Sequence, residues 1–371
     1  KIAFAIVAGK VTGKRYTTAG SALQGRLLQA VLRAGVAIRT DSPVTELIVE
    51  DGKVSGVCAL SAGKPVRISA RLGVLVNAGG FGQNQSMRDK YQPGTRAAWS
   101  ETQEGDTGDM HLEMERVGGV LAQMDQMVGY QLTLAPGSEN DYVKPGGQTL
   151  TGRPGAILVD RTGHRYLNEG GSYELYCQTM IERDRTVPAI PSWAVFDQRY
   201  ADDYPVANVK LAKKEKEWVA NGYLKKSESI EGLAEQLAIN PGVLRATIER
   251  WNGFVDNGVD EDFGRGARQY DQWLGDPFHQ PNPALGRIDQ GPFYALEIVP
   301  GDVSTYGGVI TDASARVLRG DGSVIDGLYA TGVSTASVMG AVYPGAGASI
   351  GPSLTFGYIA AKHAAGMGNQ L

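Results

Sequence analysis

The sequence has 371 residues, of which 42% are hydrophobic and 20% are charged, and 36 Lys and Arg against 40 Asp and Glu give a formal charge of −4. These values are typical of a globular protein with room for two domains, and they exclude a disordered or collagen-like chain. A negative net charge without a basic stripe argues against a nucleic-acid partner.

The few cysteines and histidines exclude further classes of protein. Cys58 and Cys177 lie far apart in the sequence, and the four histidines show no ligand spacing, so we expect neither a disulfide framework nor a metal site. Two isolated cysteines fit a reducing compartment, and no apolar run approaches the ~20 residues needed to span a bilayer. We expect a cytoplasmic protein without a transmembrane segment, and a peripheral membrane contact stays open.

The first third of the chain alternates a helix with strands. Apolar residues at helical spacing predict a helix over 21–35 that stops at Gly35. Alternating patterns predict strands over 36–40, 44–50 and 53–59, with Asp51-Gly52 as the hairpin turn between the last two, and further strands over 67–71 and 73–77. The last of these is apolar on both faces, as a buried parallel strand would be.

The pattern changes near residue 122 and returns near residue 307. Short strands over 157–160 and 193–196 precede two helices, over 229–237 with Ser229 as N-cap and over 240–252 with Asn240 as N-cap and Pro241 at the first helical position. Strands follow at 308–311, 315–318 and 328–331, and a last helix is predicted over 352–365. We predict that residues 1–121 and 299–371 form one domain, interrupted by an α+β domain at 122–298.

Two of these strands end on glycines. The apolar run that starts at Val74 ends in Gly79-Gly80, and the run that starts at Leu328 ends in Gly332. Glycines at the carboxyl edge of a sheet let the backbone touch a dinucleotide, so two such strands can flank one cofactor. An ordinary strand-end turn is the alternative explanation for each run taken alone.

The segment 332–358 joins a glycine-lined turn to a helix start. It contains six glycines, and Tyr343 brings a phenol among them. Missing Cβ atoms allow another group to approach the backbone closely, and the phenol can donate a hydrogen bond. We therefore interpret this segment as one that presses against a flat cofactor.

Four stretches of the chain, taken in order, carry a resemblance to a known family. They are 159–173 with Tyr166-Leu-Asn-Glu-Gly-Gly-Ser-Tyr173, 251–266 with Asp-Phe-Gly-Arg, 293–308, and Tyr343-Pro-Gly-Ala-Gly347 followed by Ser349-Ile-Gly-Pro352. This order resembles the flavin-dependent 3-ketosteroid 1-dehydrogenases of the fumarate reductase/succinate dehydrogenase flavoprotein superfamily. The resemblance extends over nearly the whole chain, and its collinearity is more specific than any single motif.

The resemblance implies a fold and a cofactor. The fold class would be α/β plus α+β, with a Rossmann-like FAD-binding domain, incomplete at its N-terminus, interrupted by an α+β catalytic cap domain. The cofactor would be FAD. The residues that the resemblance assigns to it are Val44, Ala78, Gly79, Gly80, Asp109, Gly332, Ser349 and Ile350.

The resemblance also implies a reaction. Tyr173 would remove a C2 proton from a 3-ketosteroid while hydride leaves C1 for flavin N5, and the Tyr343 hydroxyl and the Gly347 amide would polarise the C3 ketone. Tyr176 competes with Tyr173 for the role of base if the register slips. A free phenol has a pKa of about 10, so the base needs help from its neighbours near neutral pH. A quinone or dye-like electron acceptor would reoxidise the flavin.

One feature of the family has no counterpart in this sequence. No Gly-x-Gly-x-x-Gly follows an N-terminal strand, and the resemblance begins roughly a quarter of the way into a typical family member. We expect a missing N-terminal segment or a second chain to supply this fingerprint. Three alternatives stay open: a ketosteroid 4-dehydrogenase, a fumarate reductase-like enzyme, and a non-catalytic flavoprotein remnant. Fumarate reduction is disfavoured because Tyr-Pro-Gly replaces the family's arginine in the C-terminal loop.

Overall fold

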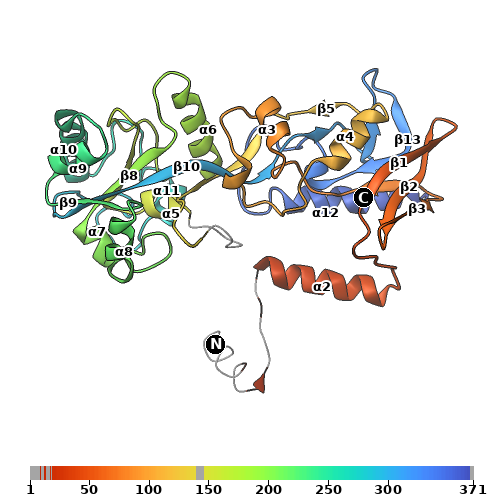
Figure 1. Ribbon diagram of the computed structural model, residues 1–371, viewed down its shortest axis with the longest axis horizontal. Helices are drawn as coiled ribbons and strands as arrows, with labels where there is room; N and C mark the ends of the chain where they lie inside the picture. Colours follow the sequence, from red (N-terminus) through yellow and green to blue (C-terminus); the bar gives the residue numbers. More distant parts are fainter. Residues whose placement is uncertain (1–8, 10–11, 14–16, 18, 139–145, 368–371) are drawn as a thin grey trace. The chain divides into compact units, whose positions relative to one another are not determined.

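The computed structural model describes residues 9, 12–13, 17, 19–138 and 146–367 (Figure 1). The chain separates into two compact units, one formed by residues 1–46 with 58–68 and the other by residues 47–57 with 69–371. The three-segment division that the sequence suggests stays a prediction.

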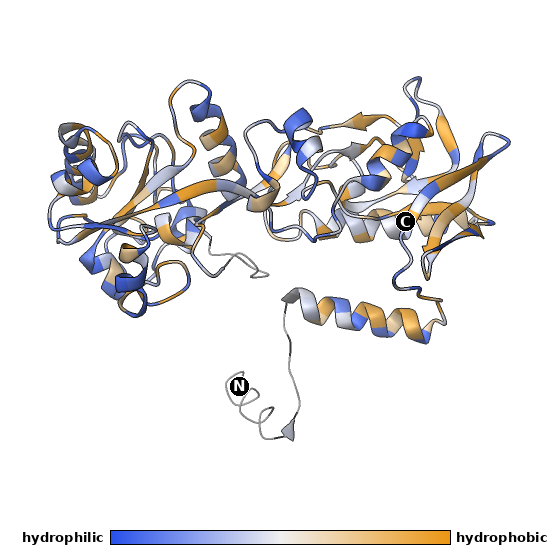
Figure 2. Cartoon of the chain, in the orientation of Figure 1, coloured by the Kyte–Doolittle hydropathy of each residue, from blue (hydrophilic) through white to orange (hydrophobic). Residues whose placement is uncertain are grey.

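The first unit contains the long helix α2 (Ala19–Arg33), which confirms the helix predicted there. Leucines at positions 23, 27, 28 and 32 of α2 are exposed, and hydrophobic residues recur along the helix in Figure 2. The strand predicted over 36–40 is wrong, because this stretch has no regular secondary structure. Val36 and Ile38 are 53% and 50% exposed, so the apolar residues of this alternating pattern do not form a buried face.

A three-stranded sheet follows in the order β1 (Val44–Glu50), β2 (Lys53–Ser61) and β3 (Lys64–Ser69). The predicted Asp51-Gly52 turn is confirmed, and both residues have positive φ values of 49° and 78°. This is the backbone conformation that a tight hairpin turn of the mirror-image type requires.

The two glycine-ended strands lie side by side. Strand β4 (Val74–Val76) pairs in parallel with β13 (Val324–Ala330), and β12 (Arg316–Leu318) covers the other edge of β13. Leu75 is 44% exposed, so β4 is parallel as predicted but is not buried on both faces. The last helix, α12 (Ile350–Ala364), packs Ala360 and Phe356 against Tyr329 of β13.

The larger sheet has five strands. Their order is β6 (Met127–Leu132), β10 (Phe293–Thr305), β8 (Ser192–Asp197) and β7 (Ala156–Val159), with β9 (Lys225–Ser227) also paired to β10. All these pairings are antiparallel.

Helices cover both faces of this sheet (Figure 1). Helix α6 (Tyr173–Asp184) packs Tyr176 and Met180 against one face, and α9 (Ile230–Gln236) and α10 (Pro241–Asn257) cover the other. Burial on both sides explains why β7 and β8 read as continuous apolar runs. The predicted caps are confirmed: Ser229 accepts from the Gly232 N–H, and Asn240 accepts from the Gly242 N–H at 2.9 Å.

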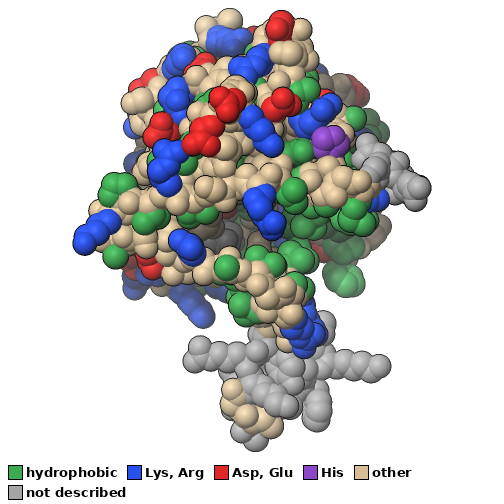
Figure 3. Space-filling model, turned by 90° about the vertical axis from the view of Figure 1, so that its right-hand side faces the viewer, with side chains coloured by type: hydrophobic (Ala, Val, Ile, Leu, Met, Phe, Trp, Pro, Cys, Tyr) green, Lys and Arg blue, Asp and Glu red, His purple; other side chains and the backbone are tan. Residues whose placement is uncertain are grey.

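Short elements connect these layers. They are α3 (Gln85–Tyr91), α4 (Asp109–Arg116), β5 (Leu121–Ala122), α5 (Gln148–Thr151), α7 (Gln198–Asp203), α8 (Glu215–Ala220), α11 (Gln269–Leu274) and β11 (Gly308–Val309). On the face drawn in Figure 3, acidic and basic side chains are intermingled, as the composition suggests. No helix in the described part of the chain combines the length and the apolar character needed to cross a membrane.

Candidate active site

Tyr173 is the first residue of α6, and the position of this helix is set by close packing on β6. Cys177 of α6 lies so near Gly129 of β6 that a Cβ atom at position 129 would clash with the cysteine Cβ. Glycine at that position therefore lets the helix approach the sheet closely. Tyr173, at the start of the helix, then lies against Tyr130 of β6.

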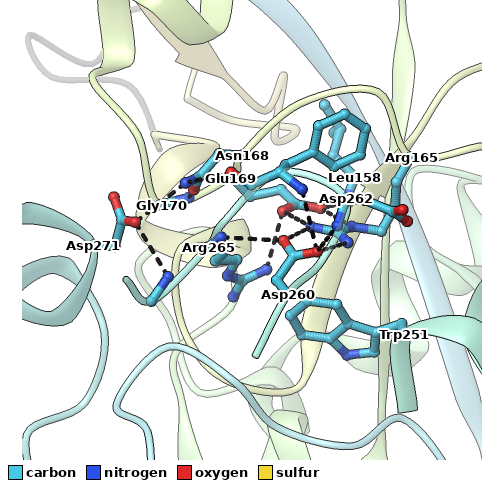
Figure 4. Close-up of polar contacts among 12 residues, drawn as sticks. Leu158, Arg165, Asn168, Glu169, Gly170, Trp251, Asp260, Asp262, Arg265 and Asp271 are labelled. Atoms are coloured by element: carbon cyan, nitrogen blue, oxygen red, sulfur yellow. Dashed lines mark hydrogen bonds and ion pairs between the residues drawn. The ribbon is translucent and has the colours of Figure 1, made fainter. Parts of the chain in front are cut away.

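The turn that leads into α6 is anchored by a buried cluster of charges (Figure 4). Arg165 Nη2 lies 2.7 Å from Glu169 Oε2 and 2.9 Å from Asp260 Oδ2. Arg265 Nη1 lies 3.4 Å from the same Glu169 oxygen. The cluster thus balances two positive charges with two negative ones, as buried ions require.

Contacts between the Trp251 ring and both guanidinium groups complete this cluster. The Trp251 ring lies 4.5 Å from the Arg165 guanidinium carbon and 4.9 Å from that of Arg265. Burial opposes the charge of Arg165, but Glu169 and Asp260 outweigh it and raise the pKa of this guanidinium. The segment 251–266, one of the four stretches that carry the family resemblance, therefore supplies partners for the turn before Tyr173.

Asn168 holds the last part of this turn. Its Nδ2 donates to Asp271 Oδ2 at 3.1 Å, and its Oδ1 accepts from the Gly170 N–H at 2.8 Å. Glu169 Oε1 accepts from the Leu158 N–H of β7 at 3.1 Å. The Asn-Glu pair is thus bonded to both the sheet and the following loop, which restricts where Tyr173 can lie.

Tyr173 and Tyr343 meet, although they lie far apart in the sequence. Their ring centroids are 5.2 Å apart at an interplanar angle of 47°, and Tyr343 lies close enough to raise the pKa of the Tyr173 phenol. Tyr130 of β6 packs edge-on against Tyr173 with a centroid distance of 6.0 Å. The structure therefore brings together the two tyrosines to which the family resemblance assigns chemistry.

The environment of Tyr173 favours its neutral form. Burial is the main cause that raises the pKa of this phenol, and the neighbouring Tyr343 hydroxyl raises it further. Tyr176, the competing residue, is 2% exposed in the core under the five-stranded sheet, with its hydroxyl 3.1 Å from Thr151 Oγ1. The geometry favours Tyr173 as the residue that can reach a ligand.

The loop that follows Tyr343 leaves space beside its backbone. Gly345 and Gly347 have φ values of +146° and +96°, and an added Cβ at either position, or at Gly351, would meet no atom within 4 Å. A cavity of about 530 Å³ lies here, lined by the 344–348 backbone and the first turn of α12. The Gly347 N–H has no acceptor within the part of the chain that the structure describes. These are the features of a cradle for a group that this chain does not itself supply.

The start of α12 borders the cradle but offers it few free donors. Ser349 is the N-cap residue and Ile350 the first helical residue, whereas the Gly351 N–H donates to the Gly347 carbonyl at 2.8 Å and Pro352 has no N–H. Gly351 and Pro352 line the cavity, and the role of Ser349 and Ile350 beside a cofactor stays a prediction.

The strand-end glycines have a different explanation. A Cβ at Gly79 would clash with the Asp106 carboxylate, and one at Gly80 would clash with Thr305 Oγ1. A Cβ at Gly332 would lie 2.7 Å from Asn77 Oδ1. The chain's own packing thus requires these glycines, so their presence does not by itself indicate a cofactor.

The remaining predicted cofactor residues have separate locations. The Ala78 N–H donates to Ser334 Oγ at 3.0 Å, which links the ends of β4 and β13. Asp109 begins α4 and accepts from Thr107 Oγ1 at 2.8 Å. Val44 begins β1 and belongs to the other compact unit. Within the described residues, no group of three or more His, Cys, Asp or Glu side chains is placed to hold a metal ion.

Sequence reasoning missed the residues that surround the two tyrosines. Tyr130, Glu174 and Tyr306 all lie close to Tyr173 or Tyr343. Burial raises the pKa of Glu174 to about 7, and the Tyr343 backbone N–H opposes this shift. Its place next to Tyr173 in the sequence is the only signal that pointed to Glu174, because the partners come from distant segments.

Comparison with known families identifies the cofactor class. The model of a family described as FAD binding domain matches residues 6–350. The chain belongs to this FAD-binding family. FAD is therefore the cofactor that the family indicates, and the open cradle at Gly345, Gly347 and Gly351 fits the approach of a flat ring to a backbone.

Similar proteins narrow the family further. The chain is 39% identical over 370 residues to a 3-oxosteroid 1-dehydrogenase of Mycobacterium tuberculosis, covering 96% of this chain and 64% of that protein. It is 34% identical to the 4-oxocyclohex-2-ene-1-carboxylate 5-dehydrogenase of Sinomonas cyclohexanicum, covering 93% and 60%. The chain thus spans less than two thirds of the length of these relatives.

A solved structure shows the same fold. The crystal structure of the 3-ketosteroid delta1-dehydrogenase from Sterolibacterium denitrificans, in complex with 1,4-androstadiene-3,17-dione, matches with a TM-score of 0.87 at 34% identity. The match covers 92% of this chain and 62% of that one. It confirms the predicted flavoprotein fold class and the predicted family resemblance.

Proposed function

We propose that this protein catalyses the FAD-dependent 1,2-desaturation of a 3-ketosteroid. The observation that carries the proposal is the contact between Tyr173 and Tyr343 beside the open glycine cradle. The relatives described above, two of which are named as dehydrogenases of 3-oxo- or 3-ketosteroids, support it.

In the proposed chemistry, groups of this chain act on two parts of the substrate, the C3 ketone oxygen and the C2 proton. A C3 ketone acidifies the neighbouring C2 protons, because its oxygen takes up the charge that develops when a proton leaves. The Tyr343 hydroxyl and the Gly347 N–H would donate to that oxygen, and Tyr173 would receive the C2 proton. FAD, when bound, supplies a hydride acceptor for the hydrogen at C1.

The protonation state of Tyr173 sets a requirement for this mechanism. Its raised pKa means that the phenol is neutral at neutral pH in the structure described here. A base must lose its proton before it can take one, so substrate binding has to change the contacts of this hydroxyl. Loss of the contact with the Tyr343 hydroxyl, which raises the pKa of Tyr173, would be such a change and would favour release of the Tyr173 proton to solvent.

We also propose a cytoplasmic location and reoxidation by a quinone or dye-like acceptor. A peripheral contact with the membrane would give access to a quinone. The isolated cysteines, of which Cys177 is fully buried, support the location, and the chemistry of reduced flavins supports the acceptor class.

The test is anaerobic reduction of the FAD-loaded protein. We expect 3-ketosteroids to bleach the oxidised flavin absorbance, with formation of a C1=C2 double bond in the product. The panel includes 4-oxocyclohex-2-ene-1-carboxylate, for which one relative is named, and succinate, which tests the fumarate reductase-like alternative. Bleaching by only one of those two, or a double bond at C4=C5, would overturn the proposal. Failure to bind FAD at all would favour a non-catalytic remnant.

A further inference from the structure

Three consecutive backbone positions before and at Tyr343 contact side chains from outside their loop. The Ala341 carbonyl accepts from Gln178 Nε2 at 3.2 Å, and the Val342 carbonyl accepts from the Tyr306 hydroxyl at 2.9 Å. The Tyr343 N–H faces the Glu174 carboxylate closely enough to oppose the rise in the pKa of that carboxyl. Gln178 Nε2 also lies 3.0 Å from Glu174 Oε1, which ties two of these side chains together.

The loop depends on these contacts because it has little packing of its own. Val342 is 59% exposed, and the flanking Gly340 and Gly345 have positive φ and no atom within 4 Å of an added Cβ. The anchors are different, since Glu174 is 2% exposed and Tyr306 3% exposed. Buried polar side chains thus hold an exposed backbone, and loss of one buried hydrogen bond costs about 1 kcal/mol.

Helix α6 carries both Tyr173 and two of the side chains that contact the backbone near Tyr343. Tyr173, Glu174 and Gln178 all belong to α6, so the side chain proposed as base and two of the three anchors move together. Tyr306, the third anchor, directly follows β10, whose pairing with β6 also supports α6. The distance between the Tyr173 and Tyr343 hydroxyls is therefore set by one connected group of elements.

We propose that Glu174, Gln178 and Tyr306 are positioning residues that clamp the 341–343 backbone and so hold the Tyr343 hydroxyl in place for the ketone of the substrate. This inference rests on the proposed function. The clamp acts through Tyr343 and touches neither the reacting atoms nor the flavin. Its alternative is a purely structural role, in which the same bonds satisfy buried polar groups without affecting where Tyr343 lies.

Tyr306→Phe tests the clamp, because it removes one hydroxyl and leaves the ring. We expect kcat for a 3-ketosteroid to fall about tenfold in the FAD-loaded protein, with a much smaller change in KM. Tyr200→Phe is the matched control: Tyr200 is also buried and its hydroxyl donates to the Leu150 carbonyl at 3.0 Å, but it lies in the core of the five-stranded sheet. The control should stay within about twofold of the parent.

The double variant Tyr306→Phe with Tyr343→Phe distinguishes a positioning role of Tyr306 from a purely structural one. If the clamp acts through the Tyr343 hydroxyl, Tyr306→Phe has little further effect once that hydroxyl is gone. A full tenfold loss in both backgrounds, or no loss in the parent, would overturn the clamp. An unaltered kcat in Tyr343→Phe alone would instead contradict the proposed role of Tyr343. Hydrogen exchange of the backbone amides would then test the clamp.

Hydrogen exchange of the backbone amides provides that second measurement and needs no turnover. We expect the Tyr343 amide, whose N–H faces Glu174, to exchange about tenfold faster in Tyr306→Phe and in Glu174→Ala than in Tyr200→Phe. Glu174→Gln keeps an acceptor for the Tyr343 N–H and should restore most of the protection. Unchanged exchange in both Tyr306→Phe and Glu174→Ala would overturn the proposal whatever the activity.

Discussion

The two tyrosines at the candidate site are held in opposite ways. Tyr173 follows a turn that is bonded to a buried network of two arginines and two carboxylates, whereas Tyr343 lies on an exposed, glycine-rich loop with three polar anchors. The first arrangement is stiff because displacement would leave buried charges unpaired. The second depends on single polar contacts, and the loss of one such contact costs only about 1 kcal/mol. The comparison contrasts a proton acceptor held by buried charges with a hydrogen-bond donor to the ketone that its polar anchors hold in place.

We expect the largest effect from substitutions that remove the hydroxyl of Tyr173 or of Tyr343. Tyr173→Phe should lower kcat for a 3-ketosteroid by about 10³-fold, and Tyr343→Phe by about 10²-fold, because one loses a proton acceptor and the other a single donor to the developing oxyanion. Steady-state kinetics measure both. The flavin absorbance spectrum should stay unchanged, and a variant that retains full turnover would remove its residue from the site.

A change in the buried network should mainly affect stability. Asp260→Asn removes one of the two negative charges that balance Arg165 and Arg265, and we expect a loss of about 3 kcal/mol in the free energy of unfolding. Asp262→Asn, two residues away, breaks an exposed pair with Arg250 and should cost less than about 1 kcal/mol. Urea denaturation compares the two. Equal losses would mean that the network does not stiffen the turn before Tyr173.

The raised pKa of Glu174 predicts that its contribution to the stability of the fold falls as the pH rises. Burial raises the pKa of its carboxyl from 4.5 to about 7 in the folded protein, so between these values the folded state keeps a proton that the unfolded state has lost. The contribution of Glu174 to stability is therefore complete below pH 4.5 and falls as pH rises to about 7.

Removing this carboxyl tests the sign. Glu174→Gln should be about 2 kcal/mol more stable than the parent at pH 8 and nearly equal to it at pH 4. Denaturation at several pH values measures the difference. Glu182→Gln, an exposed position on the same helix, should follow the parent at every pH. A stability difference that is constant with pH would contradict the assignment.

The smallest expected effect compares two glycines with the same backbone constraint. Gly347 has φ +96° in the exposed loop, and Gly155 has φ +86° beside Tyr200, with no atom closer than 3.7 Å to an added Cβ. Each Gly→Ala change should cost about 1 kcal/mol of stability from backbone strain. Only Gly347→Ala should also weaken the binding of a 3-ketosteroid, measured by titration of the flavin spectrum. Equal binding in both variants would place the substrate elsewhere.

Local sequence signals predicted the elements that local chemistry controls. Asn240-Pro241 starts α10 because the asparagine side chain caps the first turn, and Asp51-Gly52 turns the hairpin because both residues tolerate positive φ. The strand expected over 36–40 fails for the opposite reason, since a strand needs a partner and a buried face that its own residues do not specify.

The sequence by itself determined the family, the fold class, the main helices and strands, and the two tyrosines worth testing, because these depend on motifs and periodicity along the chain. The tertiary structure decided what surrounds them. Gly79 and Gly80 accommodate Asp106 and Thr305, and Glu174 meets the Tyr343 backbone, through contacts between residues distant in the sequence. Such contacts, and the burial that shifts a pKa, exist only once the chain is folded.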